Sequence, residues 1–347
     1  MKIVNQPHPL PAQAPIAKTK HRIFVRLKRI ALWFIASVAT LAALGTAYQM
    51  IATEIDKRAY LPPGEMIDMG GYQIHLYCTG TNVGGSPTVI LEQGLGGISS
   101  GWAFIQPEVA KVTRVCSYDR AGMGWSDASP ERRDAQHIAQ ELNALLQNAN
   151  IVGPYVLVGW SIGGLYARQY AEQYSDHVVG MVLLDSSHPD QWSTTSQGRA
   201  QFESNAKIFS VVPTVARLGV MRILGLLQPE LGFPTPHDQA LRVSFAATKD
   251  WEAQSAEMMA SLESAAQVRE SGSLDNRPLF VLTAAEQDQL WQSWQRDLAS
   301  LSTNSIHQIV QGADHMAFWR DPEVVKVTNA AIIQTVKAAH SGEPLKP

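Results

Sequence analysis

A serine enclosed by glycines, in the run Gly159-Trp160-Ser161-Ile162-Gly163, is the feature of this sequence best suited to chemistry. The apolar run Tyr155–Val158 before it predicts a buried strand, and the residues after Gly163 follow a helical pattern. A serine in so sharp a turn needs small neighbours, because strand and helix approach closely there. Its hydroxyl would lie at the N-terminus of the helix, where backbone N–H groups favour developing negative charge. The pattern predicts a nucleophilic serine; the simpler alternative is a glycine-rich turn in which the serine has no chemical role.

The second candidate is a histidine near the C-terminus, since a serine hydroxyl is a weak nucleophile that needs a base beside it. Among ten histidines, His315 lies in a glycine-containing turn between a predicted strand and the last predicted helix. His75 falls in a predicted strand, and His137 and His177 lie in or beside predicted helices, where structural roles are expected. We therefore expect His315 to take the proton from Ser161 and return it to the leaving group.

The elements around these residues alternate between strand and helix patterns from residue 65 to about residue 189, and again from residue 277. Such alternation predicts a mostly parallel sheet covered by helices on both faces. Residues 190–276, between these two parts, are rich in Met, Leu and Val and are interrupted by prolines. This pattern predicts helices that form a lid over one end of the sheet. The expected domains are a basic segment (1–29), an apolar segment (30–52), a linker (53–64), the core in two parts (65–189 and 277–347) and the helical lid (190–276).

The N-terminal charge distribution predicts a membrane anchor. Residues 1–29 contain seven Lys or Arg and no acidic residue, whereas residues 30–52 carry no charge. As a helix, the uncharged segment would be about 35 Å long, enough to cross a bilayer. Because basic residues stay on the cytoplasmic side, we expect a single-pass signal anchor with the following domain outside the cytoplasm, periplasmic or extracellular. The alternative is a signal peptide that is cleaved near residues 43–47.

The overall composition excludes several classes of partner. The chain has 347 residues, is 45% hydrophobic and carries a formal net charge of −3, so it offers no basic excess for nucleic acid. It contains neither a metal-ligand spacing nor a dinucleotide-binding fingerprint. We therefore expect no nucleic-acid partner, no metal and no cofactor.

Four landmarks occur in a recognisable order: the glycine-rich loop Gln93–Gly97, the turn Asp119–Asp127, the serine turn Gly159–Gly163 and the late turn Gly312–His315. Together they make residues 65–340 resemble the α/β-hydrolase fold family. The resemblance implies a mostly parallel eight-stranded sheet with a helical lid. It also implies a nucleophile, acid and histidine triad in that chain order.

The acid of this implied triad has three candidates. Asp288 lies 27 residues before His315, close to the spacing in the family, although Ala284-Ala285 stands where the family usually has a glycine. Asp185 ends the preceding predicted strand, where some members of the family place the acid, and Glu286 is the third choice. We expect Asp288 to be the acid and leave Asp185 and Glu286 as alternatives.

The same resemblance implies an oxyanion hole formed by the backbone N–H groups of Leu95 and Ile162. This chain departs from the family at Gln93, where histidine is common, so the loop must be supported in another way. It departs again at Trp160, a bulky apolar residue that would narrow the pocket beside the nucleophile. Arg120, like Asp127, is expected to serve the structure of its own turn.

A serine nucleophile narrows the reaction, because family members that open epoxides or cleave carbon–halogen bonds carry aspartate at that position. We expect a serine esterase-like hydrolase that cleaves an ester or related acyl bond of a small, hydrophobic substrate. The alternatives are a proline-iminopeptidase-like peptidase of the same fold and a membrane-tethered, non-catalytic binding protein. Intact Ser161 and His315 argue against the last alternative.

The chain has only two cysteines, Cys78 and Cys116. In the family that the chain resembles, the strands that carry them are neighbours in the sheet. A domain outside the cytoplasm meets an oxidising environment, and we expect a Cys78–Cys116 disulfide there. The alternative is two small buried thiols in a sheet.

Overall fold

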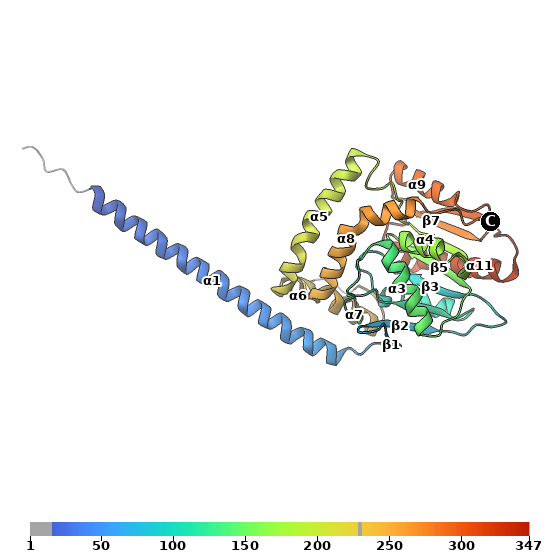
Figure 1. Cartoon of the computed structure of the whole chain (residues 1–347), viewed down its shortest axis with the longest axis horizontal. Coiled ribbons are helices and arrows are strands. Elements are labelled where there is room, and N and C mark those ends of the chain that lie inside the picture. The colour runs from blue at the N-terminus through green and yellow to red at the C-terminus, as the bar shows by residue number, and fades with distance from the viewer. Residues whose placement is uncertain (1–15, 228–230, 347) are drawn as a thin grey trace, which may run out of the picture.

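The N-terminal apolar segment forms one long helix, α1 (Ile16–Ala59), in the computed structural model, which describes residues 16–227 and 231–346. Figure 1 shows α1 projecting away from the other elements. Its large apolar side chains are exposed, and Trp33 is 75% exposed. From Phe24 to Ala59 the helix is long and apolar enough to cross a membrane. The first half of the expected basic segment 1–29, up to residue 15, lies outside the described residues.

Helix α1 ends later than expected, because residues 53–59 of the predicted linker continue the helix. No glycine or proline interrupts this part of the sequence before Pro62, so nothing local stops the helix earlier. The extension is also held by a tertiary contact, since Arg222 forms an ion pair with Asp56 at 2.6 Å. The connection to the sheet is therefore shorter than the sequence suggested.

The sheet has eight strands in the order β1-β2-β4-β3-β5-β6-β7-β8. The β1–β2 and β2–β4 pairs are antiparallel, and all the others are parallel. This confirms the mostly parallel eight-stranded sheet that the sequence predicted. The strands are β1 (Glu65–Asp68), β2 (Gln73–Thr79), β3 (Thr88–Glu92), β4 (Val115–Tyr118), β5 (Tyr155–Trp160), β6 (Val178–Leu184), β7 (Leu279–Ala284) and β8 (Ser305–Val310).

Helices cover both faces of the sheet, because side chains of the central strands alternate between two apolar clusters. Val89 and Leu91 of β3 join one cluster together with Ile332 of α11, whereas Ile90 joins the other with Leu142 of α3. The covering helices are α2 (Gln106–Val109), α3 (Ala135–Asn148), α4 (Gly163–Gln173), α9 (Gln289–Ala299), α10 (Ala317–Arg320) and α11 (Pro322–Ser341). Short 3₁₀ turns lie at Ser99–Trp102 and Ser175–His177.

Four helices lie between β6 and β7 and form the lid: α5 (Ser196–Arg217), α6 (Val220–Leu226), α7 (Thr235–Ala246) and α8 (Thr248–Arg269). Helix α8 packs against α5 on one side and against α3 and α4 on the other. It also meets the loops that follow β3 and β4, since Gln254 contacts Gly96 and Ala253 contacts Gly122. The lid therefore covers the carboxyl ends of the central strands.

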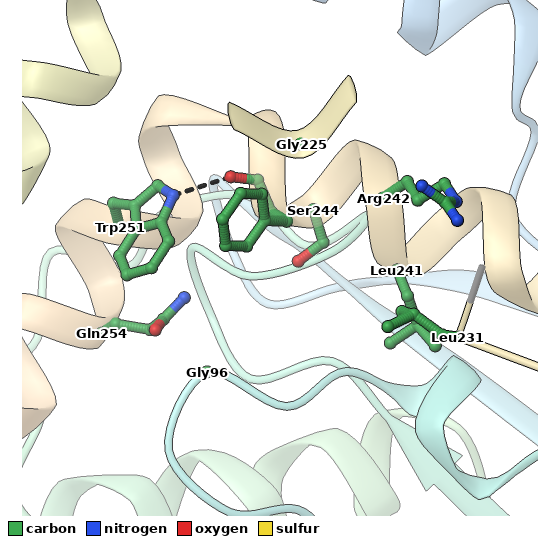
Figure 2. Close-up of a pocket in the computed structure, with 9 residues that line it drawn as sticks. Gly96, Gly225, Leu231, Leu241, Arg242, Ser244, Trp251 and Gln254 are labelled. Atoms are coloured by element: carbon green, nitrogen blue, oxygen red, sulfur yellow. Dashed lines mark hydrogen bonds between the residues drawn. The ribbon is translucent and has the colours of Figure 1, made fainter. Parts of the chain in front are cut away.

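A cavity of about 200 Å³ separates the lid from the loop after β3 (Figure 2). Gly225 of α6 and Gly96 of the loop lie on opposite sides of it. Its lining is mostly apolar and comes from α6, α7 and α8. The other lining residues are Leu231, Leu241, Arg242, Ser244, Phe245, Trp251 and Gln254.

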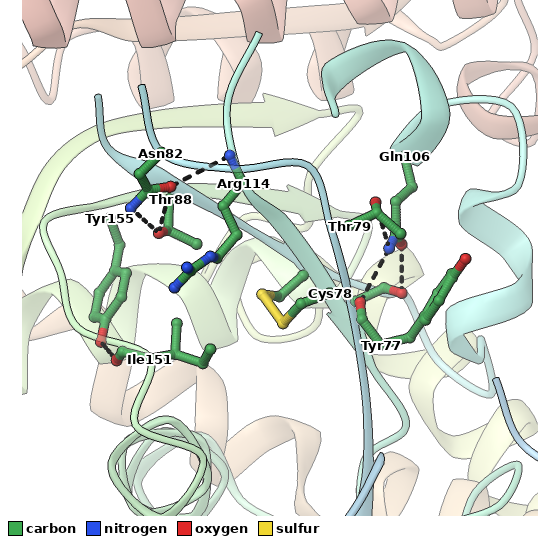
Figure 3. Close-up of a disulfide and its surroundings, with 11 residues drawn as sticks. Tyr77, Cys78, Thr79, Asn82, Thr88, Gln106, Arg114, Ile151 and Tyr155 are labelled. Atoms are coloured by element: carbon green, nitrogen blue, oxygen red, sulfur yellow. Dashed lines mark hydrogen bonds between the residues drawn. A yellow bond between two sulfur atoms is a disulfide. The ribbon is translucent and has the colours of Figure 1, made fainter. Parts of the chain in front are cut away.

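Cys78 and Cys116 form a disulfide between β2 and β4 (Figure 3). The two residues are directly opposite each other in the antiparallel register, with their Cα atoms 4.0 Å apart. The strands that carry them are sheet neighbours, as the resemblance implied. The bridge joins the antiparallel edge of the sheet to its parallel part.

Candidate active site

Ser161 lies in a sharp turn between β5 and α4, with a backbone φ of +55°. This left-handed conformation is uncommon for a residue with a Cβ atom and is characteristic of functional sites. Its neighbours must be glycine: a Cβ atom on Gly159 would lie 2.6 Å from Gly164 Cα, and one on Gly163 would lie 2.5 Å from Gln93 O. The close approach of strand, helix and loop therefore holds the serine in this geometry.

His315 lies in the turn after β8, between Ser161 and an aspartate. Its Nε2 atom is 3.0 Å from Ser161 Oγ, and its Nδ1 atom is 2.6 Å from Asp185 Oδ2. The histidine side chain is 32% exposed, whereas the aspartate is fully buried. The arrangement has a structural origin in the sheet, because Trp160 and Leu184 are paired across β5 and β6. The residues that follow them, Ser161 and Asp185, therefore lie at the same edge.

Donors other than His315 hold the Asp185 carboxylate in place. Oδ1 accepts hydrogen bonds from the backbone N–H of Ala284 (3.1 Å) and from the indole N–H of Trp291 (2.9 Å). Oδ2 accepts from the side-chain amide of Gln287 (2.7 Å) in addition to the histidine. Each oxygen has two partners, so the carboxylate has no freedom to rotate. This fixes the direction in which it presents Oδ2 to His315.

The other two acid candidates lie elsewhere. Asp288 is exposed and caps the N-terminus of α9, accepting a hydrogen bond from Trp291 N at 2.8 Å. Glu286 is also exposed. No hydrogen bond joins either carboxylate to His315 in the described part of the chain, whereas Asp185 has one. The family spacing favoured Asp288, but helix α9 begins there and uses its side chain as a cap.

The two amides expected to form the oxyanion hole belong to Leu95, in the loop after β3, and to Ile162, the residue after the serine. The N–H groups of Leu95 and Ile162 donate no hydrogen bond within residues 16–227 and 231–346. The loop of Leu95 runs against the serine, since a Cβ atom on Gly94 would lie 3.1 Å from Ser161 Cβ. Two free backbone N–H groups beside a nucleophile can stabilise developing negative charge by donating hydrogen bonds to it.

Arg120 supports this loop from below, a role that the sequence did not reveal. Its buried guanidinium donates to the carbonyl oxygens of Gln93 and Gly94, each at 2.7 Å. It also pairs with Glu92 at 2.7 Å and with Glu257 of α8 at 2.8 Å. Burial opposes the charge, but the two carboxylates raise the pKa of Arg120 well above its usual value. Since Glu257 belongs to the lid, the network also connects the lid to the loop.

Trp160 packs against the histidine. Its indole N–H donates to the backbone carbonyl of His315 at 2.9 Å, and the two ring centroids are 5.1 Å apart. The sequence suggested that this residue would add apolar bulk beside the nucleophile, and the structure shows where the bulk lies. It covers one side of the imidazole and fixes the turn after β8.

A second buried His–Asp pair, outside the serine site, stabilises the turn after β4. His75 Nδ1 lies 3.0 Å from Asp119 Oδ2, and its Nε2 atom faces the carbonyl of Pro63. Burial alone would lower the pKa of His75, but Asp119 and the two hydrogen bonds raise it. Two acceptors facing both ring nitrogens indicate an imidazolium. Among the described residues, no group of three His, Cys, Asp or Glu side chains could hold a metal ion.

Comparison with known proteins identifies the family. The profile described as "alpha/beta hydrolase fold" matches residues 87–322, which is more than half of the chain. The chain belongs to the α/β-hydrolase family. An esterase from Thermogutta terrifontis, whose structure has been solved, shares the fold of this α/β hydrolase. The alignment has a TM-score of 0.58 and 21% identity and covers 80% of this chain and 98% of the esterase.

Two curated relatives of this α/β hydrolase are longer proteins. An uncharacterised protein of Schizosaccharomyces pombe is 28% identical over 224 residues, which are 62% of this chain and 40% of that protein. An uncharacterised vacuolar membrane protein of Saccharomyces cerevisiae is 32% identical over 134 residues, 34% of this chain and 21% of that protein. The matches thus span less than half of either relative.

Proposed function

We propose that this α/β hydrolase is a serine hydrolase with Ser161 as nucleophile, His315 as general base and Asp185 as the acid. The observation that carries the proposal is the continuous contact from the serine hydroxyl through the imidazole to the buried carboxylate. Asp185 accepts a hydrogen bond from the Nδ1–H group, which keeps the proton on Nδ1 and leaves Nε2 unprotonated and facing the serine. In this assignment Asp185 replaces Asp288, which the sequence favoured.

In the proposed reaction, His315 Nε2 removes the proton of Ser161 as the serine oxygen attacks the acyl carbon. The resulting oxyanion accepts hydrogen bonds from the N–H groups of Ile162 and Leu95, which have no other partner in the described chain. The imidazolium then gives its proton to the leaving group, and an acyl-enzyme remains. Water, activated by the same histidine, releases the acid and restores the serine.

The proposed substrate is an ester or related acyl compound with an apolar group. The mostly apolar cavity between the lid and the loop after β3 supports an apolar substrate. Esterases occur among the structural neighbours, and a relative in Cronobacter turicensis, 30% identical over 102 residues, is described as a carbamate hydrolase. Hydrolysis of an ester and hydrolysis of a carbamate both transfer an acyl group to water.

We also propose that residues 30–52 anchor the enzyme in a membrane with the catalytic domain outside the cytoplasm. The exposed apolar surface of α1, the basic residues before it and the Cys78–Cys116 disulfide support this topology. A reporter fused after the last residue is expected to be active only outside the cytoplasm. Release of the protein in soluble form with a new N-terminus near residues 46–49 would show a cleaved signal instead.

Labelling with a fluorophosphonate probe tests the proposed chemistry directly. The full-length protein is expected to be labelled at Ser161 and to hydrolyse p-nitrophenyl esters. Ser161→Ala and His315→Ala, alone or together, are expected to lose nearly all activity to a similar extent, because the two residues act as one unit. If the probe does not label the protein and no ester is hydrolysed, a binding role is favoured instead. Turnover that is retained in Ser161→Ala would refute Ser161 as the nucleophile.

A further inference from the structure

The outer surface of the lid exposes large apolar side chains on α5 and α6. Leu226 is 76% exposed and Leu227 is 78% exposed, although both lie at the end of a helix that packs on α7. The other large apolar side chains exposed on these two helices, which together are called the lid face, are Ile208, Val211, Val220, Ile223 and Leu224. Monomeric soluble proteins rarely expose large contiguous apolar surfaces unless a partner or a membrane covers them.

Helix α1 passes beside α6 and the end of α5 that adjoins it (Figure 1). A Cβ atom on Gly45 would lie 2.4 Å from the carbonyl oxygen of Leu218, at the corner between α5 and α6. Farther along α1, Gln49 is buried and donates a hydrogen bond to the carbonyl of Ala246 in the lid at 2.8 Å. The lid corner is therefore fixed against α1 at the level of Gly45.

That level lies inside the segment proposed to cross the membrane. Gly45 precedes the end of the uncharged segment at Ala52 by seven residues, or about 10 Å along a helix at ~1.5 Å per residue. Helices that lie in a membrane interface typically bury their apolar face by roughly 5–10 Å. The contact with α1 thus puts the lid face at the depth of the headgroups and first acyl carbons.

Helix α6 also forms a wall of the cavity beside the catalytic loop. Gly225 lines that cavity opposite Gly96 (Figure 2), whereas the next two residues, Leu226 and Leu227, are exposed. One short helix therefore separates the proposed bilayer surface from the cavity, whose other wall is Gly96, the residue after Leu95 of the proposed oxyanion hole. A substrate with an apolar tail in the membrane would pass this wall to reach the cavity.

We propose that the lid face is embedded in the membrane interface and that the substrate is a membrane-resident lipid ester, which enters the cavity beside α6 directly from the bilayer. The inference rests on the proposed hydrolase function and on the proposed anchor. It commits to lipid as the occupant of the lid face because the corner between α5 and α6 lies against α1, the helix that is long and apolar enough to cross a membrane. A second copy of the chain or another protein covering the face is the competing outcome of the test.

The position of the lid can be measured without any activity. Leu226→Cys and, as a control, Val152→Cys would be labelled with an environment-sensitive fluorophore in the full-length protein, in phosphatidylcholine nanodiscs that contain a doxyl-quencher lipid. Val152 is 75% exposed and precedes β5, at the end of the sheet away from the lid. The native cysteines are already paired and do not compete for the label. We expect the label at Leu226 to be blue-shifted and to lose most of its emission to the quencher, and the label at Val152 to keep its emission. A label at Leu226 that stays in water, or is shielded but not quenched by lipid, would overturn the proposal.

The route of the substrate can be measured by comparing two esters. The double variant L226D/L227D is expected to hydrolyse p-nitrophenyl palmitate dispersed in the nanodiscs at least about tenfold more slowly, because two carboxylates oppose insertion. The double variant is expected to hydrolyse soluble p-nitrophenyl acetate at a rate within about twofold of that of the unmodified protein. The control Val152→Asp is expected to hydrolyse both esters within the same range. The replaced residues all lie on the surface, outside the site. Equal losses on both esters, or no loss on either, would overturn the proposed route. If the unmodified protein hydrolyses neither ester, the proposed function fails, and quenching at Leu226 alone then decides the position of the lid.

Discussion

Replacing Asp185 with asparagine is expected to abolish most of the activity, whereas the same replacement at Asp288 is expected to have little effect. The reason lies in the four donors around Asp185. Oδ1 faces two obligate donors, Ala284 N–H and the indole of Trp291, and Oδ2 faces His315 Nδ1 and the amide of Gln287. An asparagine NH₂ group in either orientation would therefore meet donors instead of acceptors.

The less disruptive orientation keeps the oxygen toward the backbone N–H and turns the NH₂ group to His315. The imidazole then has to accept at Nδ1, and its proton moves to Nε2, where it prevents the ring from acting as a base toward Ser161. A wrong histidine tautomer of this kind costs about 10⁴ in kcat, equivalent to roughly 5 kcal/mol of transition-state stabilisation. Asp288→Asn should change kcat by less than about twofold, because asparagine caps a helix as well as aspartate does.

The assay is the turnover of a p-nitrophenyl ester by both variants, with thermal unfolding as a check that each one is folded. The two substitutions are chemically identical, so Asp288→Asn serves as the matched control for Asp185→Asn. The assignment of Asp185 as the acid would be refuted by a folded Asp185→Asn protein that retains a tenth or more of kcat, because the wrong tautomer should cost far more than that. Sensitivity at Asp288 instead would restore the assignment that the sequence favoured.

Three further variants test other parts of the structure. Burial raises the pKa of Asp250 to about 7, so the unfolded chain releases that proton from about pH 4 while the folded chain keeps it. The stability of the unmodified protein should therefore fall relative to Asp250→Asn by up to about 1.4 kcal/mol per pH unit between pH 4 and 7. A constant difference in unfolding temperature across this range would contradict the prediction. Arg120→Lys keeps the positive charge but loses the forked guanidinium donors that hold the loop after β3. We expect kcat to fall by roughly 10–100-fold with little change in KM. An unchanged kcat would mean that Arg120 contributes to stability alone. Replacing both Cys78 and Cys116 by serine should cost about 3–4 kcal/mol, since the bridge closes a loop with a sequence separation of 38. Alkylation without reductant followed by mass spectrometry checks the bridge itself, and two free thiols would contradict it.

The sequence was sufficient for the order of the elements and for the class of fold. Apolar runs and glycine turns depend on neighbours only a few residues away, so the strand before Ser161 and the helix after it could be predicted from local pattern. The same holds for the uncharged segment 30–52, because a span of a bilayer is a property of one continuous stretch. Ser161 and His315 could be named as candidates for this reason, each from the turn in which it lies.

The partner of His315 could not be chosen in this way. Asp185 and Asp288 both follow predicted strands, and only the pairing of β5 with β6 brings one of them to the level of the serine. The contacts of Arg120 with Glu257 and of α1 with the lid likewise join residues more than a hundred positions apart. Local propensity carries no information about such contacts, because they depend on which buried surfaces pack together. The sequence by itself thus determined the fold and the candidate nucleophile and base, whereas tertiary packing decided which carboxylate contacts His315, how the loop is supported and where the lid lies beside α1.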